Sequence, residues 1–260
     1  MALLELSFEG PVARVTLDRP DARNALSREM CDAIVDAFVQ IDADPDVRLT
    51  VLGGNGPVFC SGADFAAVSG PSGLEFLPAF ERMLEAVARH RLPTLAVIHG
   101  AALGGGFQLA CVCDFRIAAD DAQIGIPSSR LGILVNFENI QRLVLLGGIA
   151  RAKEILMAGR TFSGGEAADA GLVTMGVPAD GMPAVVQAFT DRVIALAPLS
   201  VQGSKRAIQT VIDHLASVRD ASPEAVAEID RLVALAYSSA DLAEGLAAMS
   251  ERRPPDFTAS

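Results

Sequence analysis

Hydrophobic and polar residues alternate near the start of the chain, on both sides of a turn at Glu9-Gly10-Pro11. A period of two places every second side chain on one face of a strand, so this pattern predicts two paired strands. The alternating apolar positions are Leu4, Leu6, Phe8, Ala13, Val15 and Leu17.

The period then changes to that of a helix. Ser27 is a suitable N-cap, and an apolar stripe follows it at helical spacing, formed by Met30, Ile34, Phe38 and Ile41. Two mainly apolar segments, at 49–52 and 92–98, predict buried strands. From about residue 198 the pattern is helical throughout. We therefore expect an α/β core over 1–197 and a helical region over 198–260.

Glycine-containing loops follow both predicted buried strands. In the loop at 99–108, three glycines in a row (104–106) precede a predicted helix at 107–112. Free backbone N–H groups and the positive end of a helix dipole favour an anionic oxygen there. Alone, such a run equally fits a tight turn required only for packing. A glycine-containing loop earlier in the chain, at 53–64, changes the picture, because two loops can aim two N–H groups at one point, as in an oxyanion hole.

These loops carry a resemblance to a known family. Residues 59–64 (Phe-Cys-Ser-Gly-Ala-Asp) and 99–106 (His-Gly-Ala-Ala-Leu-Gly-Gly-Gly) resemble motifs of the enoyl-CoA hydratase/isomerase (crotonase) superfamily. So do residues 19–26, and shorter matches follow in family order at 150–154, 165–173 and 252–257. The resemblance covers nearly the whole chain. It implies a spiral of ββα turns with a C-terminal helical region that builds trimers, often paired into hexamers.

The resemblance also implies a ligand. Relatives bind an acyl-CoA thioester, whose carbonyl oxygen would here accept hydrogen bonds from the amides of Ala63 and Gly105. Coenzyme A enters as part of the substrate, so no separate cofactor and no metal are expected. Arg23, together with Ala25 and Ala63, is expected to contact coenzyme A, with Arg23 on a phosphate. The alternative for Arg23 is a solvated surface arginine.

The residues for proton transfer depart from the family pattern. Hydratases of the family use two glutamates, and their positions match Gln108 and Ser128 here. A carboxylate used by other relatives matches Asn136. None of these side chains accepts a proton at neutral pH, and losing general acid–base help costs about 10²–10⁴ in rate per group. Efficient ordinary hydration is therefore not expected.

One carboxylate, Glu138, remains close to this segment in the sequence. Either it is a relocated base facing the acyl pocket, or it stabilises the first turn of a helix capped by Asn136. Asp64 is expected to brace its loop, and His99 to have a structural role. Two functions stay open: a lyase or isomerase acting on an acyl-CoA, and a non-catalytic acyl-CoA binding protein.

Composition narrows the partners and the compartment. A net charge of −11 argues against nucleic acid and anionic membrane surfaces. Residues 92–113 lack charged side chains over the length of a membrane span, but a proline, a histidine and three glycines in a row favour a buried core segment. The start of the chain lacks signal-peptide features. Four cysteines without metal-ligand spacing predict reduced thiols. We expect a cytoplasmic homotrimer or dimer of trimers.

Overall fold

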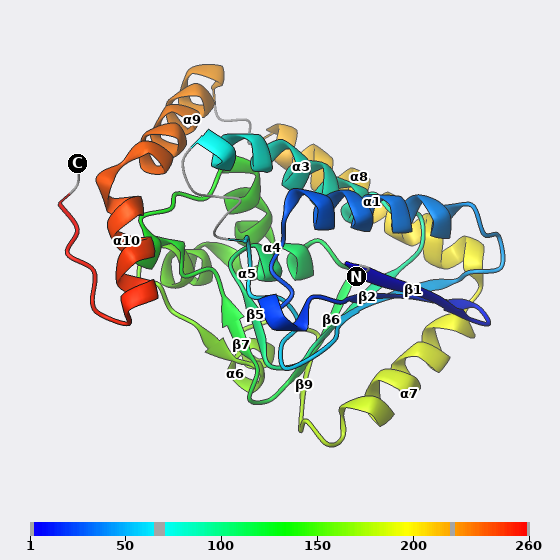
Figure 1. The fold of residues 1–260 in the computed structure, drawn as a ribbon. Coiled ribbons are helices and arrows are strands. Elements are labelled where there is room, and N and C mark those ends of the chain that lie inside the picture. The colour runs from blue at the N-terminus through cyan, green and yellow to red at the C-terminus, as the bar shows by residue number, and fades with distance from the viewer. Residues whose placement is uncertain (1–2, 65–70, 219–221, 259–260) are drawn as a thin grey trace.

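The computed structural model describes residues 3–64, 71–218 and 222–258 (Figure 1). Its main sheet has the strand order β1-β2-β3-β4-β6-β9. Only the β1–β2 pair is antiparallel, and every other pair is parallel. The strands are β1 (Leu4–Glu9), β2 (Val12–Leu17), β3 (Leu49–Gly54), β4 (Thr94–Ile98), β6 (Phe115–Ala119) and β9 (Met175–Val177).

The predicted N-terminal hairpin is confirmed. Leu6 pairs with Val15, and Gly10 turns the chain with a φ of 57°. Such a positive φ is a conformation that glycine adopts without strain. Both predicted buried strands are also present, as β3 and β4.

A smaller sheet begins directly after β4 of the main sheet. It has the order β5-β7-β8, with β5 (Ala101–Leu103), β7 (Gln123–Gly125) and β8 (Phe162–Ser163). The chain passes from β4 to β5 through His99 and Gly100, and Gly100 has a φ of 62°. A Cβ at Gly100 would lie 2.1 Å from the Pro57 carbonyl oxygen, so only glycine fits there. The charge-free segment 92–113 thus forms two strands and a short helix, α4 (Gly105–Cys111).

Two long helices lie side by side on one face of the main sheet, α1 (Arg28–Asp42) and α3 (Pro71–Ala88) (Figure 1). Helix α1 begins as predicted, because the Ser27 hydroxyl accepts a hydrogen bond from the Met30 amide. Its apolar stripe of Met30, Ile34, Phe38 and Ile41 is buried. Helix α7 (Met182–Ile194) contacts β3 and β6. The remaining core helices are η1 (Pro20–Ala22), η2 (Ser128–Leu131), α5 (Phe137–Leu156) and α6 (Gly164–Asp169).

The last part of the chain is helical, as predicted. It consists of α8 (Pro198–Val218), α9 (Pro223–Ser238) and α10 (Ala240–Glu251). In Figure 1, α9 and α10 lie beyond α5, at the side of the molecule where the C-terminus ends. Helix α8 exposes apolar side chains, among them Leu199, Ile208 and Val211. The homotrimer or dimer of trimers, and the division at 197/198, remain predictions.

Within the described ranges, no helix is by itself long and apolar enough to cross a bilayer. Two sharply bent helix pairs meet the length and composition test only when their halves are combined, α7 with the first part of α8 and α9 with α10. The cytoplasmic location stays a prediction.

Candidate active site

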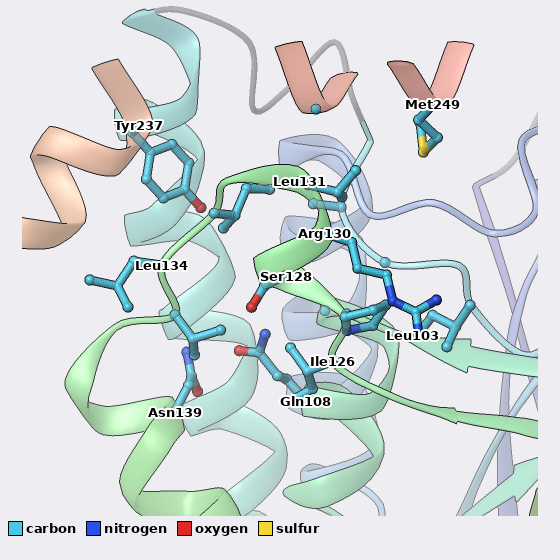
Figure 2. A pocket seen from close by; sticks show the side chains of 18 of the residues that line it. Leu103, Gln108, Ile126, Ser128, Arg130, Leu131, Leu134, Asn139, Tyr237 and Met249 are labelled. Atoms are coloured by element: carbon cyan, nitrogen blue, oxygen red, sulfur yellow. The ribbon is translucent and has the colours of Figure 1, made fainter. Parts of the chain in front are cut away.

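The two glycine loops and the C-terminal helices enclose a cavity of about 370 Å³ (Figure 2). This volume is in the range of small-molecule sites. The first loop contributes Ser61–Ala63, and the second contributes Leu103–Gly105. Side chains of α3, α5, η2, α9 and α10 complete the wall, which is largely apolar.

Backbone hydrogen bonds join the two loops. The Cys60 amide donates to the Ala101 carbonyl at 3.0 Å, and the Leu103 amide donates to the Cys60 carbonyl at 3.0 Å. A Cβ at Gly62 would lie 2.8 Å from the Leu103 oxygen and 3.3 Å from the Gly105 nitrogen. Glycine at position 62 is therefore what allows the first loop to approach the start of α4.

Ala63 and Gly105 both line the cavity. The amide of Leu26 donates to Gly62, and the amide of Asp64 donates to Leu26, so Ala63 lies between two bonds to the same strand. In a parallel bridge the N–H of such a middle residue points away from that strand. Gly105 is the first residue of α4, where an N–H has no partner inside the helix. In the described part of the chain, neither N–H is used to hold the loops together.

Asn24 anchors the first loop, a role that the sequence reasoning missed. It is fully buried, and its Nδ2 lies 2.9 Å from the carbonyl oxygens of Asn55 and Val58 and 3.1 Å from that of Phe59. Its Oδ1 accepts from the Arg19 amide. The available signal was an amide side chain inside the family-like motif at 19–26.

Asp64 braces the loop as expected. Its carboxylate forms an ion pair of 3.1 Å with Arg19, whose guanidinium also donates to the Ala25 carbonyl. Ala25 itself is buried, Arg23 is exposed, and neither lines the cavity. Their contact with coenzyme A remains a prediction.

Four neutral polar residues of the cavity wall have side chains without a hydrogen-bond partner among the described residues: Ser61, Gln108, Ser128 and Tyr237. Figure 2 shows Gln108 and Ser128 facing each other, with Tyr237 farther along the same side. The Gln108 Oε1 atom is buried and unpaired. The two positions that match the family glutamates therefore meet in one cavity, on α4 and η2.

The hypothesis that Glu138 is a relocated base is wrong. Glu138 is exposed and does not line the cavity. The side chain of Asn136 accepts a hydrogen bond from the Asn139 amide and so caps α5. This cap sets the start of the helix, which places Glu138 in its first turn facing outward. The alternative interpretation, a carboxylate near the helix dipole, is the one that the structure has.

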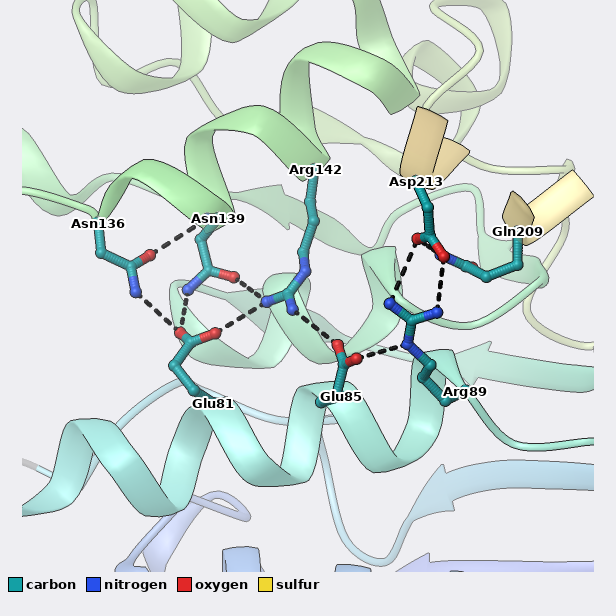
Figure 3. Close-up of polar contacts among 8 residues, drawn as sticks. All are labelled: Glu81, Glu85, Arg89, Asn136, Asn139, Arg142, Gln209 and Asp213. Atoms are coloured by element: carbon teal, nitrogen blue, oxygen red, sulfur yellow. Dashed lines mark hydrogen bonds and ion pairs between the residues drawn. The ribbon is translucent and has the colours of Figure 1, made fainter. Parts of the chain in front are cut away.

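The carboxylate that bonds to the start of α5 is instead Glu81 of α3, which the sequence reasoning also missed (Figure 3). Its Oε1 accepts from the side-chain amides of Asn136 at 3.0 Å and Asn139 at 2.5 Å. Its Oε2 accepts from Arg142 at 2.9 Å. Glu81 lies one layer behind the wall, because Asn136 and Asn139 line the cavity and Glu81 does not.

Charged groups are scarce at the cavity. Among the described lining residues, only Arg130 and Arg253 are charged. Arg130 donates to the Gly159 carbonyl at 2.6 Å, and Arg253 is paired with Glu244 and Glu251. His99 lies elsewhere, with its Nε2 3.0 Å from the Gly56 carbonyl. The part of the wall that is described therefore presents no carboxylate and no imidazole.

The cysteines are free thiols. Cys60, next to the first loop, donates to the Asn24 carbonyl, and burial raises its pKa to about 12. At neutral pH it is a thiol and not a nucleophile. The described ranges contain no group of three or more His, Cys, Asp or Glu side chains suited to a metal ion.

Comparison with known proteins identifies the family and agrees with the fold. The model of the family described as enoyl-CoA hydratase/isomerase matches residues 7–260. The chain belongs to this family. It is 34% identical over 251 residues to a probable enoyl-CoA hydratase of Mycobacterium bovis, covering 95% of this chain and 94% of that protein. It is 33% identical over 260 residues to a crotonyl-CoA hydratase of Syntrophomonas wolfei, covering 97% and 96%.

Solved structures give the same result for the fold. An enoyl-CoA hydratase from Mycobacterium avium subsp. paratuberculosis superposes with a TM-score of 0.85 at 27% identity, covering 99% of each chain. The fold is thus the α/β crotonase fold that the motifs predicted. Its family membership makes the chain an acyl-CoA enzyme of the crotonase superfamily.

Proposed function

We propose that the cavity binds an acyl-CoA thioester and stabilises its enolate through the N–H groups of Ala63 and Gly105. The observation that supports this most is the meeting of the two glycine loops, with both residues at the cavity. Negative charge develops on the thioester oxygen when the α-carbon becomes carbanion-like. A well-placed donor is worth about 3 kcal/mol, mostly in the transition state.

Gln108 and Ser128 limit the reactions that this site can perform. A glutamine or a serine without a base positions water or a polar substrate group by hydrogen bonding, but it does not take a proton at neutral pH. We infer that ordinary hydration is slow, and that proton transfers in the favoured lyase or isomerase reaction use a substrate group or bound water.

A second candidate is a protein that binds acyl-CoA without turning it over. The wall as described supports it, because the oxyanion loops are intact while no carboxylate faces the cavity there. This second candidate binds the same ligand through the same loops as the enzyme, and differs only in that the bound thioester does not react.

The test combines binding with turnover. Purified protein is mixed with crotonyl-CoA and longer enoyl-CoAs, and loss of the conjugated-thioester absorbance is followed. Changing Gln108 and Ser128 together to glutamate should raise the hydration rate by at least about 10², since each acid–base group contributes about 10²–10⁴. Glu138→Gln is the matched carboxylate control and should change nothing.

The possible outcomes separate the proposals. Failure of every CoA thioester to bind would refute both. Tight binding with no turnover of any ester selects the non-catalytic version. A wild-type hydration rate equal to that of the double variant would show that Gln108 and Ser128 do not limit the reaction.

The nucleotide end and the assembly state have their own tests. Arg23 is exposed and directly precedes Asn24, the anchor of the first loop, and we propose that it contacts a coenzyme A phosphate. Arg23→Ala should then weaken acyl-CoA binding but not binding of the matching acyl-pantetheine, which lacks the nucleotide.

Sedimentation velocity would test the proposed homotrimer or dimer of trimers.

A further inference from the structure

One unpartnered polar side chain of the wall, Tyr237, comes from a part of the chain remote from the two glycine loops. It is the only tyrosine in the sequence. It lies on α9, and Val233, one helical turn earlier, also lines the cavity. Residues four apart share a helix face, so this face of α9 is the one that covers the cavity.

The orientation of Tyr237 brings its polar end to the cavity. Figure 2 shows the ring on the cavity wall with the hydroxyl directed inward, toward the side occupied by Ser128. The residue is half-buried, and its hydroxyl has no hydrogen-bond partner in the portion of the chain that is described. The hydroxyl of a tyrosine in such a position usually has a hydrogen-bond partner. Because this one has none among the described residues, it is available to a bound molecule.

The chemistry of this hydroxyl selects a class of ligand. Burial raises the pKa of Tyr237, so the phenol stays protonated at neutral pH and donates. Its polar neighbours at the cavity, Gln108 and Ser128, are neutral as well. Of the two lining cations, Arg253 is paired with two carboxylates. Arg130 keeps its charge while it donates to the Gly159 carbonyl, and its side chain extends away from Tyr237 (Figure 2). The complement of the wall around Tyr237 is therefore a neutral oxygen acceptor rather than a carboxylate.

We propose that Tyr237 is a specificity-determining residue that donates a hydrogen bond to a neutral oxygen carried by the acyl chain. The preferred substrates are then oxygenated acyl-CoAs, with a hydroxyl, carbonyl or ether group along the chain, in preference to plain alkyl esters. This inference rests on the proposed acyl-CoA function and adds the class of acyl group.

The test measures binding by calorimetry and does not depend on turnover. Hexanoyl-CoA is compared with hexanoyl-CoAs that carry one hydroxyl or one oxo group at carbon 4, 5 or 6. Wild-type protein should bind at least one oxygenated ester about tenfold more tightly than hexanoyl-CoA. Tyr237→Phe should remove that preference and leave the affinity for hexanoyl-CoA unchanged, because the ring is kept.

Ser128→Ala is the matched hydroxyl deletion. It should keep the preference, which would assign it to Tyr237. The proposal is overturned if wild type does not discriminate, if Tyr237→Phe weakens all esters equally, or if only Ser128→Ala removes the preference. Those results leave acyl-CoA binding intact, whereas a failure of hexanoyl-CoA and all its derivatives to bind would refute the proposed function itself.

Discussion

Two neighbouring regions of this protein use similar side chains in opposite ways. At the cavity wall, Gln108 has no partner among the described residues. In the network behind it, defined as Glu81, Asn136, Asn139 and Arg142, every side chain is bonded (Figure 3). Asn139 lines the same cavity as Gln108, yet its Nδ2 donates to Glu81 and its Oδ1 accepts from Arg142.

The difference teaches what makes an amide available to a ligand. Residue type does not decide it, since Gln108 and Asn139 carry the same group. The neighbours decide it: α3 and α5 supply an ion pair behind Asn139, whereas no described residue forms a hydrogen bond with the Gln108 Oε1. We expect changes in the network to act on stability and changes in the wall to act on ligand binding.

The largest effect should follow from Glu81→Ala. This change removes the acceptor of the Asn136 and Asn139 side-chain amides and the closer of the two carboxylates that pair with Arg142. It should lower the free energy of unfolding by about 3 kcal/mol. Urea unfolding measures it. The control is Glu9→Ala in β1, outside the network, where the glutamate is exposed and pairs with Arg14 at 2.7 Å. That change should cost less than about 1 kcal/mol. Equal losses would contradict a special role for the network.

Lowering the pH should destabilise the protein through a third site, His90, which belongs to neither the cavity wall nor the network. His90 is buried, with its Nε2 2.9 Å from the Thr50 hydroxyl, and burial lowers its pKa to about 4 although Asp42 lies close by. The unfolded chain takes up this proton near pH 6.5 and the folded chain only near pH 4. The free energy of unfolding should therefore fall as pH decreases through this window, by up to about 1.4 kcal/mol per pH unit.

Urea titrations between pH 4 and 7 check this slope, and His90→Gln should flatten it. Thioester affinity should stay constant over the same window where the protein remains folded, since Gln108, Ser128 and Tyr237 do not titrate there. A steep pH dependence of binding that tracks none of the ligand's own groups would break the view of a neutral wall.

A smaller effect is expected where α10 closes the wall. A Cβ at Gly245 would lie 2.7 Å from the backbone of Leu131 in η2, the element that also carries Ser128. Gly245→Ala should cost about 2 kcal/mol and weaken thioester binding by displacing α10. Gly203→Ala is the matched control, because nothing lies within 4 Å of a Cβ there. It should be neutral or stabilising by up to about 1 kcal/mol. If Gly245→Ala left binding unchanged, α10 would not shape the cavity.

The smallest effects on stability should come from the wall itself. Gln108→Met removes a buried, unpaired acceptor, so the free energy of unfolding should change by less than about 1 kcal/mol, in the stabilising direction. Asn139→Leu, the comparable change in the network, should destabilise. A large loss of stability in Gln108→Met would mean that Gln108 has a structural role, and would end the contrast between the two regions.

Much of this arrangement follows from local patterns in the sequence. The hairpin of β1 and β2, the Ser27 cap of α1, the two glycine loops and the helical end of the chain each depend on a few adjacent residues. The positions of Gln108 and Ser128 at the cavity followed from the family resemblance. The direction of the Glu138 side chain did not follow from the sequence. The direction of a side chain in the first turn depends on where the helix starts and on what packs against it.

The sequence by itself determined the elements, the family and the loops that meet at the cavity, because period, capping and glycine conformation act over a few residues. Only the tertiary structure decided which polar groups are paired. Glu81 reaches Asn139 across 58 positions of sequence, Asn24 reaches Phe59 across 35, and Tyr237 joins the wall from the far end of the chain. Such partners are chosen by the packing of whole helices, and no local pattern records them.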